Sequence, residues 1–139
     1  MERPNGLDGL HVLFIDDEAD TRKLIAAVLM QHGVVVTTVA TVAQALQELE
    51  RSQSDSSGVS RPDVIISDIR MPDEDGYTLI RKIKALEAEK GWQIPTAALT
   101  AYLAEDRAKV IKAGFQSHIH KLAQPTELIA MVAKLANRL

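Results

Sequence analysis

The amino-acid sequence predicts an α/β fold in which five parallel strands alternate with five helices to form a doubly wound sheet. Five short apolar runs recur along the chain, each followed by a segment with the apolar spacing of a helix. Parallel strands need crossover connections, and the intervening helices supply them. The 139 residues suffice for one domain with a stable core of its own.

The first strand–helix unit follows a lead-in that we expect to be flexible over residues 1–9. The run LHVLFI, which starts at Leu10, predicts a strand that stops at three successive acids. The helix after it is predicted to end near Gly33, because glycine is favoured as a C-terminal helix cap. Its apolar face is predicted to consist of Leu24, Ile25, Val28 and Leu29.

The second unit begins with the β-branched run VVVTTV at residues 34–39, which predicts a strand. Thr41 and Gln44 have the spacing of a capping box, which predicts a helix through about residue 50. Residues 52–60, SQSDSSGVS, are of low complexity. We interpret them as an exposed loop within one domain rather than a boundary between two.

Three further units complete the chain. The strands are predicted at residues 64–67, 96–99 and 117–120, and the helices at about 76–88, at about 104–113 and from about 125 to the C-terminus. Pro95 opens the fourth strand, and Pro125 opens the last helix because proline is favoured in a first helical turn. Right-handed crossovers then favour the flavodoxin-like strand order 2-1-3-4-5.

Composition limits the class of protein. The chain is 46% hydrophobic and 25% charged, which is typical of a soluble globular protein. Its net charge of -3 gives no basic field for nucleic acid or an acidic membrane. The sequence has no cysteine, which excludes disulfides and thiolate chemistry, and no apolar segment of membrane-spanning length. We expect a soluble, cytoplasmic domain.

Functional side chains follow four of the five predicted strands. They are Asp16 with Asp17, Asp68, Thr100 and Lys121. In the expected strand order, ligands bind beyond the carboxyl ends of the first and third strands, where the three aspartates would meet. Taken singly, each has an ordinary interpretation: a helix N-terminal acid pair, a turn-capping Asp, a strand-end Thr and a solvated Lys.

Three neighbouring carboxylates repel one another, and a hard divalent cation such as Mg²⁺ relieves that repulsion. We therefore expect Asp17 and Asp68 to bind Mg²⁺ directly and Asp16 to act partly through water. The backbone carbonyl of Arg70 is expected to complete the protein ligands. The four histidines are scattered, and their spacing does not indicate a zinc site.

The same side chains suit phosphoryl transfer, which needs a positioned acceptor and neutralised charge on the phosphoryl oxygens. Asp68 would be the nucleophile and would become an aspartyl phosphate. Lys121 would pair with one phosphoryl oxygen, and Thr100 would donate a hydrogen bond to another.

Four segments together resemble the receiver (response-regulator) domain of two-component signalling, and most closely the receivers of hybrid sensor histidine kinases. They are FIDDEADTRKLI, DVIISDIRMPDEDGYTLI, IPTAALTAY and AGFQSHIHKLAQPTELI, and the likeness covers residues 10–139. The resemblance implies that Asp68 takes a phosphoryl group from a histidine kinase or a histidine phosphotransfer domain. It also implies an acidic pair at Asp16 and Asp17, a switch hydroxyl at Thr100 and a phosphate-pairing lysine at Lys121.

The sequence departs from the family pattern at two positions near the lysine. Leu122 stands where the family usually has a proline after a cis peptide, and a cis bond before Leu would cost about 2.5–4 kcal/mol. A trans bond could place Lys121 differently. His118 stands at the position of the switch aromatic, where it either weakens the coupling to Thr100, makes it pH-sensitive, or has no switching role.

Direct DNA binding is not expected, because the sequence has no helix-turn-helix or basic stripe. We expect output by protein contact, either from a free-standing regulator or from one module of a larger hybrid kinase chain. Candidates for a docking surface for the phosphoryl donor are Ile69, Met71 and Leu103, whereas Ile119 is expected to belong to the core and Tyr102 to be a surface aromatic.

Two other functions remain open. One is a pseudo-receiver that binds partners without phosphorylation, which Leu122 and His118 would favour. The other is an aspartate-based phosphatase of the haloacid dehalogenase type. That chemistry needs a second Asp two residues after the nucleophile, where this chain has Arg70. We therefore expect no enzyme activity beyond self-phosphorylation and self-dephosphorylation.

Overall fold

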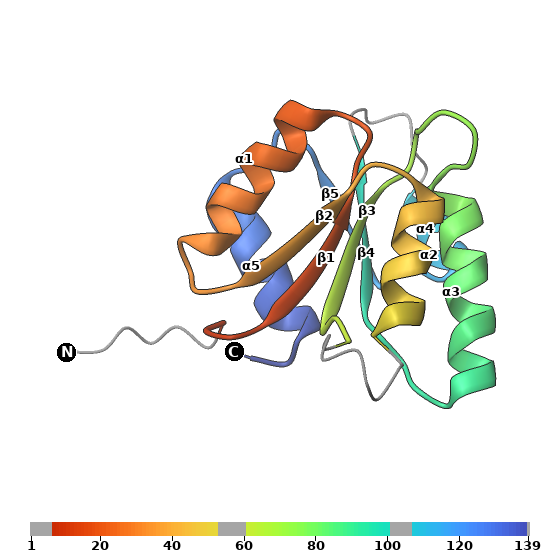
Figure 1. The fold of residues 1–139 in the computed structure, drawn as a ribbon. Helices are drawn as coiled ribbons and strands as arrows, with labels where there is room; N and C mark the ends of the chain where they lie inside the picture. Colours follow the sequence, from red (N-terminus) through yellow and green to blue (C-terminus); the bar gives the residue numbers. More distant parts are fainter. Residues whose placement is uncertain (1–6, 53–60, 101–106, 139) are drawn as a thin grey trace.

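A computed structural model describes residues 7–52, 61–100 and 107–138 (Figure 1). The strands form one parallel sheet in the order β2-β1-β3-β4-β5, as predicted. They are β1 (His11–Ile15), β2 (Val35–Val39), β3 (Val64–Asp68), β4 (Thr96–Thr100) and β5 (Ser117–His120). The three inner strands are buried along their whole length, whereas the edge strands β2 and β5 are partly exposed. Burial on both faces explains why the inner strands are continuous apolar runs.

Helices cover both faces of the sheet (Figure 1). They are α1 (Ala19–Met30), α2 (Val42–Arg51), α3 (Gly76–Lys90), α4 (Arg107–Ala113) and α5 (Pro125–Leu135). Successive residues of β1 serve opposite faces: Phe14 packs with α1 and α5, and Leu13 packs with α2 and α3. A third cluster joins α3 and α4 around Phe115. Among the described residues, none of the helices has the length and hydropathy that a membrane crossing requires.

The caps predicted at Thr41 and Gly33 form in part, because the Gln44 side chain bonds to Ala40 rather than to Thr41 and the C-terminal cap of α1 is Gln31. The Thr41 hydroxyl accepts a hydrogen bond from the backbone N–H of Gln44 at 3.1 Å, and the Gln44 side chain accepts one from the N–H of Ala40 at 2.8 Å. Gly33 has φ +81°, and its N–H donates to the carbonyl of Met30 at 3.1 Å. A side chain at Gly33 would collide with Asp8, so the helix end and the preceding turn are packed together.

Residues 7–9, which fall in the lead-in predicted to be flexible, belong to the folded domain. Residues 7–9 form a turn, and Leu7 is only 1% exposed within the core. The turn is fixed by a hydrogen bond from the N–H of Gly9 to the carbonyl of Gly33, 2.9 Å long. An apolar residue isolated among polar ones carries no periodicity, which is why this contact was not predicted.

The apolar face predicted for α1 is wrong at one position. Ile25 and Leu29 are buried against the sheet, whereas Leu24 is 62% exposed. Two adjacent apolar residues on a helix point about 100° apart, so only one of this pair faces the core. The predicted start of the fourth helix at residue 104, and residues 53–60 of the predicted loop, lie outside the described residues.

Candidate functional site

The carboxyl ends of four neighbouring strands bring the predicted site residues together. Ile15 of β1 is paired in register with Ser67 of β3, so the residues that follow them, Asp16 and Asp68, lie next to each other. Thr100 ends β4 and Lys121 follows β5 on the other side of Asp68. The sheet register therefore brings the strand-end residues together, as the sequence pattern predicts.

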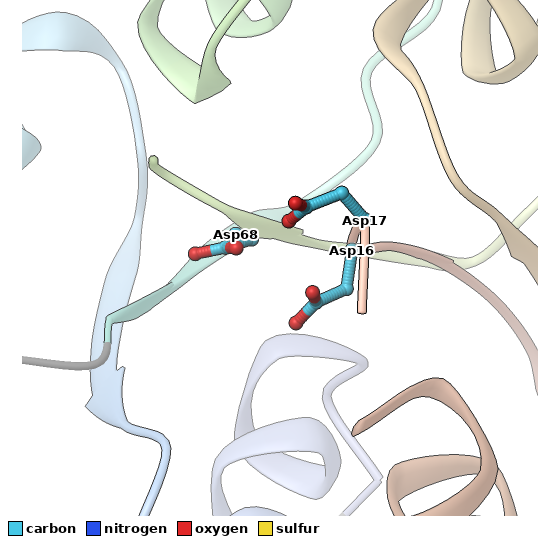
Figure 2. A group of neighbouring side chains, drawn as sticks. All are labelled: Asp16, Asp17 and Asp68. Carbon is cyan, nitrogen blue, oxygen red and sulfur yellow. The ribbon is translucent and has the colours of Figure 1, made fainter. Parts of the chain in front are cut away.

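The three aspartates form one cluster (Figure 2). One carboxylate oxygen from each of Asp16, Asp17 and Asp68 lies within 4.8 Å of the other two. Asp16 and Asp68 are buried, with Asp68 only 3% exposed, whereas Asp17 faces solvent. Loop hydrogen bonds hold this arrangement: Asp16 Oδ1 accepts from the N–H of Glu18 at 2.9 Å, and its carbonyl accepts from Arg22 Nη1 at 2.7 Å.

Lys121 reaches into the same cluster. Its Nζ lies 3.1 Å from Asp16 Oδ2, 3.2 Å from Asp68 Oδ2 and 3.2 Å from Glu18 Oε1. The peptide bond between Lys121 and Leu122 is trans, since the described chain contains no cis peptide. The missing proline therefore does not move the lysine out of the site.

Burial and mutual repulsion disturb the titration of these groups. Burial raises the pKa of Asp68 to about 6, the neighbouring Asp16 charge adds to the effect, and Lys121 partly offsets it. Burial likewise raises the pKa of Asp16 above its ordinary value. Burial alone would lower the pKa of Lys121, but the charges of Asp68 and Asp16 outweigh it and raise that pKa. The site thus has more negative charge than one lysine neutralises.

This charge imbalance fits a divalent cation. Asp16 Oδ2 is buried, and although it lies 3.1 Å from Lys121 Nζ, no described residue donates it a well-directed hydrogen bond. A buried carboxylate oxygen with spare lone pairs, beside two further carboxylates, is the all-oxygen donor set that Mg²⁺ prefers. Asp16, Asp17 and Asp68 could hold such an ion. The carbonyl of Arg70 stays a predicted ligand.

The hydroxyl of Thr100 is engaged within the protein. Thr100 is 2% exposed, and its Oγ1 lies 3.1 Å from Nε2 of His118. The sequence identified both residues as switch candidates, but the direct hydrogen bond between them was not predicted. Thr100 is paired with His120 in the sheet, so His118, two residues earlier on β5, lies diagonally opposite Thr100 on the same face.

Two positioning features were also missed. Glu18 pairs with Lys121, and its place as the third of three successive acids was the available signal. Gly76 begins α3, and a Cβ there would lie 2.6 Å from the carbonyl oxygen of Asp68 and 2.9 Å from Cα of Ile69. Only glycine allows the start of α3 to approach the backbone of Asp68 and Ile69 this closely.

Burial contradicts the docking candidate Ile69 and agrees with the expectation that Ile119 belongs to the core. Ile69 is fully buried, and Met71 and Ile119 are partly buried and pack against the core. Tyr102 and Leu103 lie outside the described residues. The exposed apolar side chains near Lys121 are instead Leu24, 62% exposed, and Leu122, 83% exposed. They line an apolar groove of about 220 Å³ between α1 and the start of α5, and Lys121 lines it too.

The fold and the site define a class of protein: a doubly wound α/β domain with an acidic cluster and a lysine at the β1/β3 switch point. The model of the response regulator receiver domain family matches residues 12–133. The chain therefore belongs to this family.

Relatives support this assignment. An uncharacterized 14.6 kDa protein from the sodA1 3′ region of Leptolyngbya boryana is 36% identical over 124 residues, covering 88% of this chain and 87% of that protein. Hybrid signal transduction histidine kinase D of Dictyostelium discoideum is 33% identical over 138 residues. That match covers 96% of this chain but only 9% of the kinase.

Solved structures show the same fold. The receiver domain of sensor histidine kinase PA1611 from Pseudomonas aeruginosa PAO1, which has a magnesium ion coordinated in its active site cleft, matches with a TM-score of 0.76 and 30% identity. The match covers 93% of this chain and 98% of that one. A response regulator structure from Chloroflexus aurantiacus J-10-fl matches with a TM-score of 0.78 and 27% identity, over 94% and 100% of the two chains.

Proposed function

We propose that this domain is a phosphoacceptor that receives a phosphoryl group on Asp68 from a phospho-histidine in a Mg²⁺-dependent reaction. The surroundings of Asp68 are the observation that carries the proposal. Asp68 is a buried carboxylate at a strand end, within ion-pair distance of a lysine and beside two further carboxylates. A bound Mg²⁺ would supply positive charge to the phosphoryl oxygens and relieve the repulsion between the carboxylates.

In the proposed reaction, a carboxylate oxygen of Asp68 forms a bond to phosphorus while the bond between phosphorus and the donor imidazole nitrogen breaks. The electron pair of the broken bond stays on that nitrogen, and the imidazole takes up a proton as it leaves. Lys121 is placed to pair with a phosphoryl oxygen, since its Nζ already lies 3.2 Å from Asp68 Oδ2. The Thr100 hydroxyl would donate to another oxygen after leaving His118.

To pair with a phosphoryl oxygen, Lys121 must release one of its three carboxylate partners. Its contact with Glu18 is the one most easily released, because Glu18 is largely exposed and water can solvate its carboxylate. The contacts with Asp16 and Asp68 are buried and hold the ammonium group inside the site.

The phosphoryl donor is proposed to be a helical histidine kinase or histidine phosphotransfer domain that docks on the groove beside Leu24 and Leu122. The groove shares Lys121 with the acceptor site, so a partner seated there brings its histidine close to Asp68. Signalling would then proceed by protein contact in the cytoplasm, either from this chain alone or as part of a longer hybrid kinase.

A phosphorylation assay tests the proposal. The domain is incubated with Mg²⁺ and acetyl phosphate, and phosphoryl incorporation is followed by intact mass. We expect one phosphoryl group on the wild type and none on Asp68→Asn. The matched control is Asp73→Asn, in the same loop but exposed; asparagine tolerates the positive φ of 66° found there, so labelling should persist. Labelling of Asp68→Asn at the wild-type level would defeat the proposal.

A pseudo-receiver that acts without phosphorylation is the second candidate. The contacts of Lys121 with three carboxylates favour it, because they stabilise the site without a phosphoryl group. Binding of a partner kinase with equal affinity to wild type and to Asp68→Asn, in the absence of any labelling of the wild type, would support this candidate instead.

A further inference from the structure

The hydrogen bond between Thr100 and His118 links the acceptor site to a titratable side chain. Oγ1 of Thr100 and Nε2 of His118 are 3.1 Å apart, and Thr100 is almost fully buried. Histidine changes charge between about pH 5 and 8, unlike a carbocyclic aromatic side chain. The partner of the proposed phosphate-binding hydroxyl therefore changes its donor and acceptor properties in that range.

The direction of this hydrogen bond decides what Thr100 can do. A hydroxyl carries a single hydrogen. When Nε2 of a neutral His118 accepts that hydrogen, Thr100 cannot donate it to a phosphoryl oxygen. A protonated imidazole has N–H groups at both nitrogens and can only donate, so the Thr100 oxygen accepts and its hydrogen is left for the phosphoryl group.

The surroundings give His118 access to solvent and a mixed electrostatic field. It lines a cavity of about 450 Å³ between α4, β5 and α5. The charged side chains that line the same cavity in the described part of the chain are Arg107 from α4 and Glu127 and Lys134 from α5. The two cations oppose a charged imidazole. Glu127 favours one, although its Oε1 also accepts a hydrogen bond from the N–H of Gln124 at 2.8 Å.

We propose that His118 is a positioning residue whose protonation frees the Thr100 hydroxyl for the phosphoryl group on Asp68, so that a fall in pH favours phosphorylation. This inference rests on the proposed function of Asp68. The coupling is reciprocal: a phosphoryl group that takes the Thr100 hydrogen favours the protonated form of His118.

The test compares phosphorylation rates with saturating Mg²⁺ and acetyl phosphate between about pH 6 and about pH 8. His118→Gln keeps a hydrogen-bonding side chain but cannot titrate in this range. The ratio of the wild-type rate to the His118→Gln rate removes the titration of Asp68 and of acetyl phosphate, which are common to both proteins. We expect this ratio to rise roughly fivefold from pH 8 to pH 6, the scale of one neutral hydrogen bond.

His32→Gln is the matched control. His32 lies beyond the C-terminal end of α1, where its Nδ1 contacts the carbonyl of Val28 at 3.2 Å, and it has no place in the site. Its ratio to wild type should be flat with pH. Replacing Thr100 by Val in both the wild-type and His118→Gln backgrounds should abolish the pH-dependent ratio between them, because no hydroxyl is left to position.

A second readout does not depend on rates. The imidazole resonances of His118 are titrated by NMR in the free domain and in the domain held in the phosphorylated state. The midpoint should move to higher pH on phosphorylation in the wild type, by more than in a Thr100→Val variant. A flat rate ratio, or midpoints that move equally in both proteins, overturns the inference and leaves the acceptor role of Asp68 intact. A wild type that is never labelled overturns both.

Discussion

At the scale of single residues, one lysine is shared among several carboxylates. Lys121 Nζ lies between 3.1 and 3.2 Å from Asp16, Glu18 and Asp68, while Asp17 adds a fourth negative group at the rim. A single ammonium group cannot neutralise this cluster. Burial is the main reason that the pKa of Asp68 rises although it contacts a cation, and the neighbouring Asp16 charge adds to the rise. The excess negative charge is the physical basis for the proposed metal.

Asp17→Asn should weaken Mg²⁺ binding without unfolding the domain. Asp17 is exposed, so an amide is accommodated, but the cluster loses one of its three carboxylates. We expect the dissociation constant for Mg²⁺ to rise about tenfold or more in an NMR titration, in line with the loss of a charged ligand. Asp20→Asn, in the first turn of α1 and also exposed, is the control and should bind as wild type does. Equal affinities for Asp17→Asn and wild type would remove Asp17 from the ligand set.

The titration of Asp68 predicts how stability depends on pH when no metal is added. Its pKa of about 6 in the folded state exceeds the ordinary value of 3.8, so the folded state binds the proton more tightly than the unfolded chain. The stabilisation is complete below about pH 4 and is lost as the pH rises through about 6. At about 1.4 kcal/mol for each pH unit, the full loss is about 3 kcal/mol.

Urea unfolding across this pH range measures the effect. Asp68→Asn should be more stable than wild type at pH 8 by about 1–3 kcal/mol, and the difference should shrink towards pH 4. Added Mg²⁺ should stabilise the wild type at pH 8 far more than the variant. A difference in stability that is the same at pH 4 and pH 8 would show that Asp68 is not strained by burial and repulsion.

At the scale of elements, the start of α3 fixes the backbone around Asp68 and Ile69. The N–H of Gly76 donates to the carbonyl of Ile69 at 2.8 Å, and the helix is capped by Asp75, whose Oδ1 accepts from the N–H of Thr78 at 3.0 Å. The helix therefore closes directly onto the turn that follows β3, and its first residue has no space for a side chain.

Gly76→Ala should destabilise the domain by about 2–4 kcal/mol, because the new Cβ would collide with backbone atoms that can move only by distorting β3 and the turn after it. Gly91→Ala is the comparison. Gly91 has φ +77° but open space around it, so its cost should be about 1 kcal/mol, from backbone strain alone. Chemical denaturation of both variants gives the comparison, and equal costs would show that the close approach at Gly76 is unimportant.

A variant in the groove between α1 and the start of α5 should distinguish phosphorylation by a protein donor from phosphorylation by a small molecule. Leu122→Gln should slow phosphorylation by a phosphorylated histidine phosphotransfer domain about tenfold, the scale of a lost apolar contact, and leave acetyl phosphate labelling unchanged. Met30→Gln replaces another exposed apolar side chain, at the far end of α1, and should change neither rate. An equal loss with both donors would place the effect in the site rather than in docking.

At the scale of the whole molecule, the order of elements and the meeting of the strand-end residues could be predicted from the sequence. Each depends on a repeated local pattern, such as the buried run that ends at Asp68, combined with the general rules of parallel sheets. The sequence could not show the contacts that depend on side-chain direction across elements. The bond between Thr100 and His118, and the exposure of Leu24, both follow from packing geometry.

The position of Lys121 beside the trans peptide before Leu122 is another contact that the sequence could not show. The missing proline raised a doubt about Lys121 that local reasoning could not resolve, since a loop can place a side chain in several ways. The structure resolves it through distance: the ammonium group contacts Asp16, Glu18 and Asp68 with a trans bond.

Locating the phosphoryl group tests most directly whether Asp68 is the phosphoacceptor. The domain is treated with acetyl phosphate, with and without Mg²⁺, then reduced with borohydride, which converts an aspartyl phosphate to homoserine, and mapped by peptide mass spectrometry. We expect homoserine at position 68 alone, and only when Mg²⁺ is present. Modification at Asp16 or Asp17 instead, or no modification anywhere in the Mg²⁺-loaded protein, would contradict this expectation.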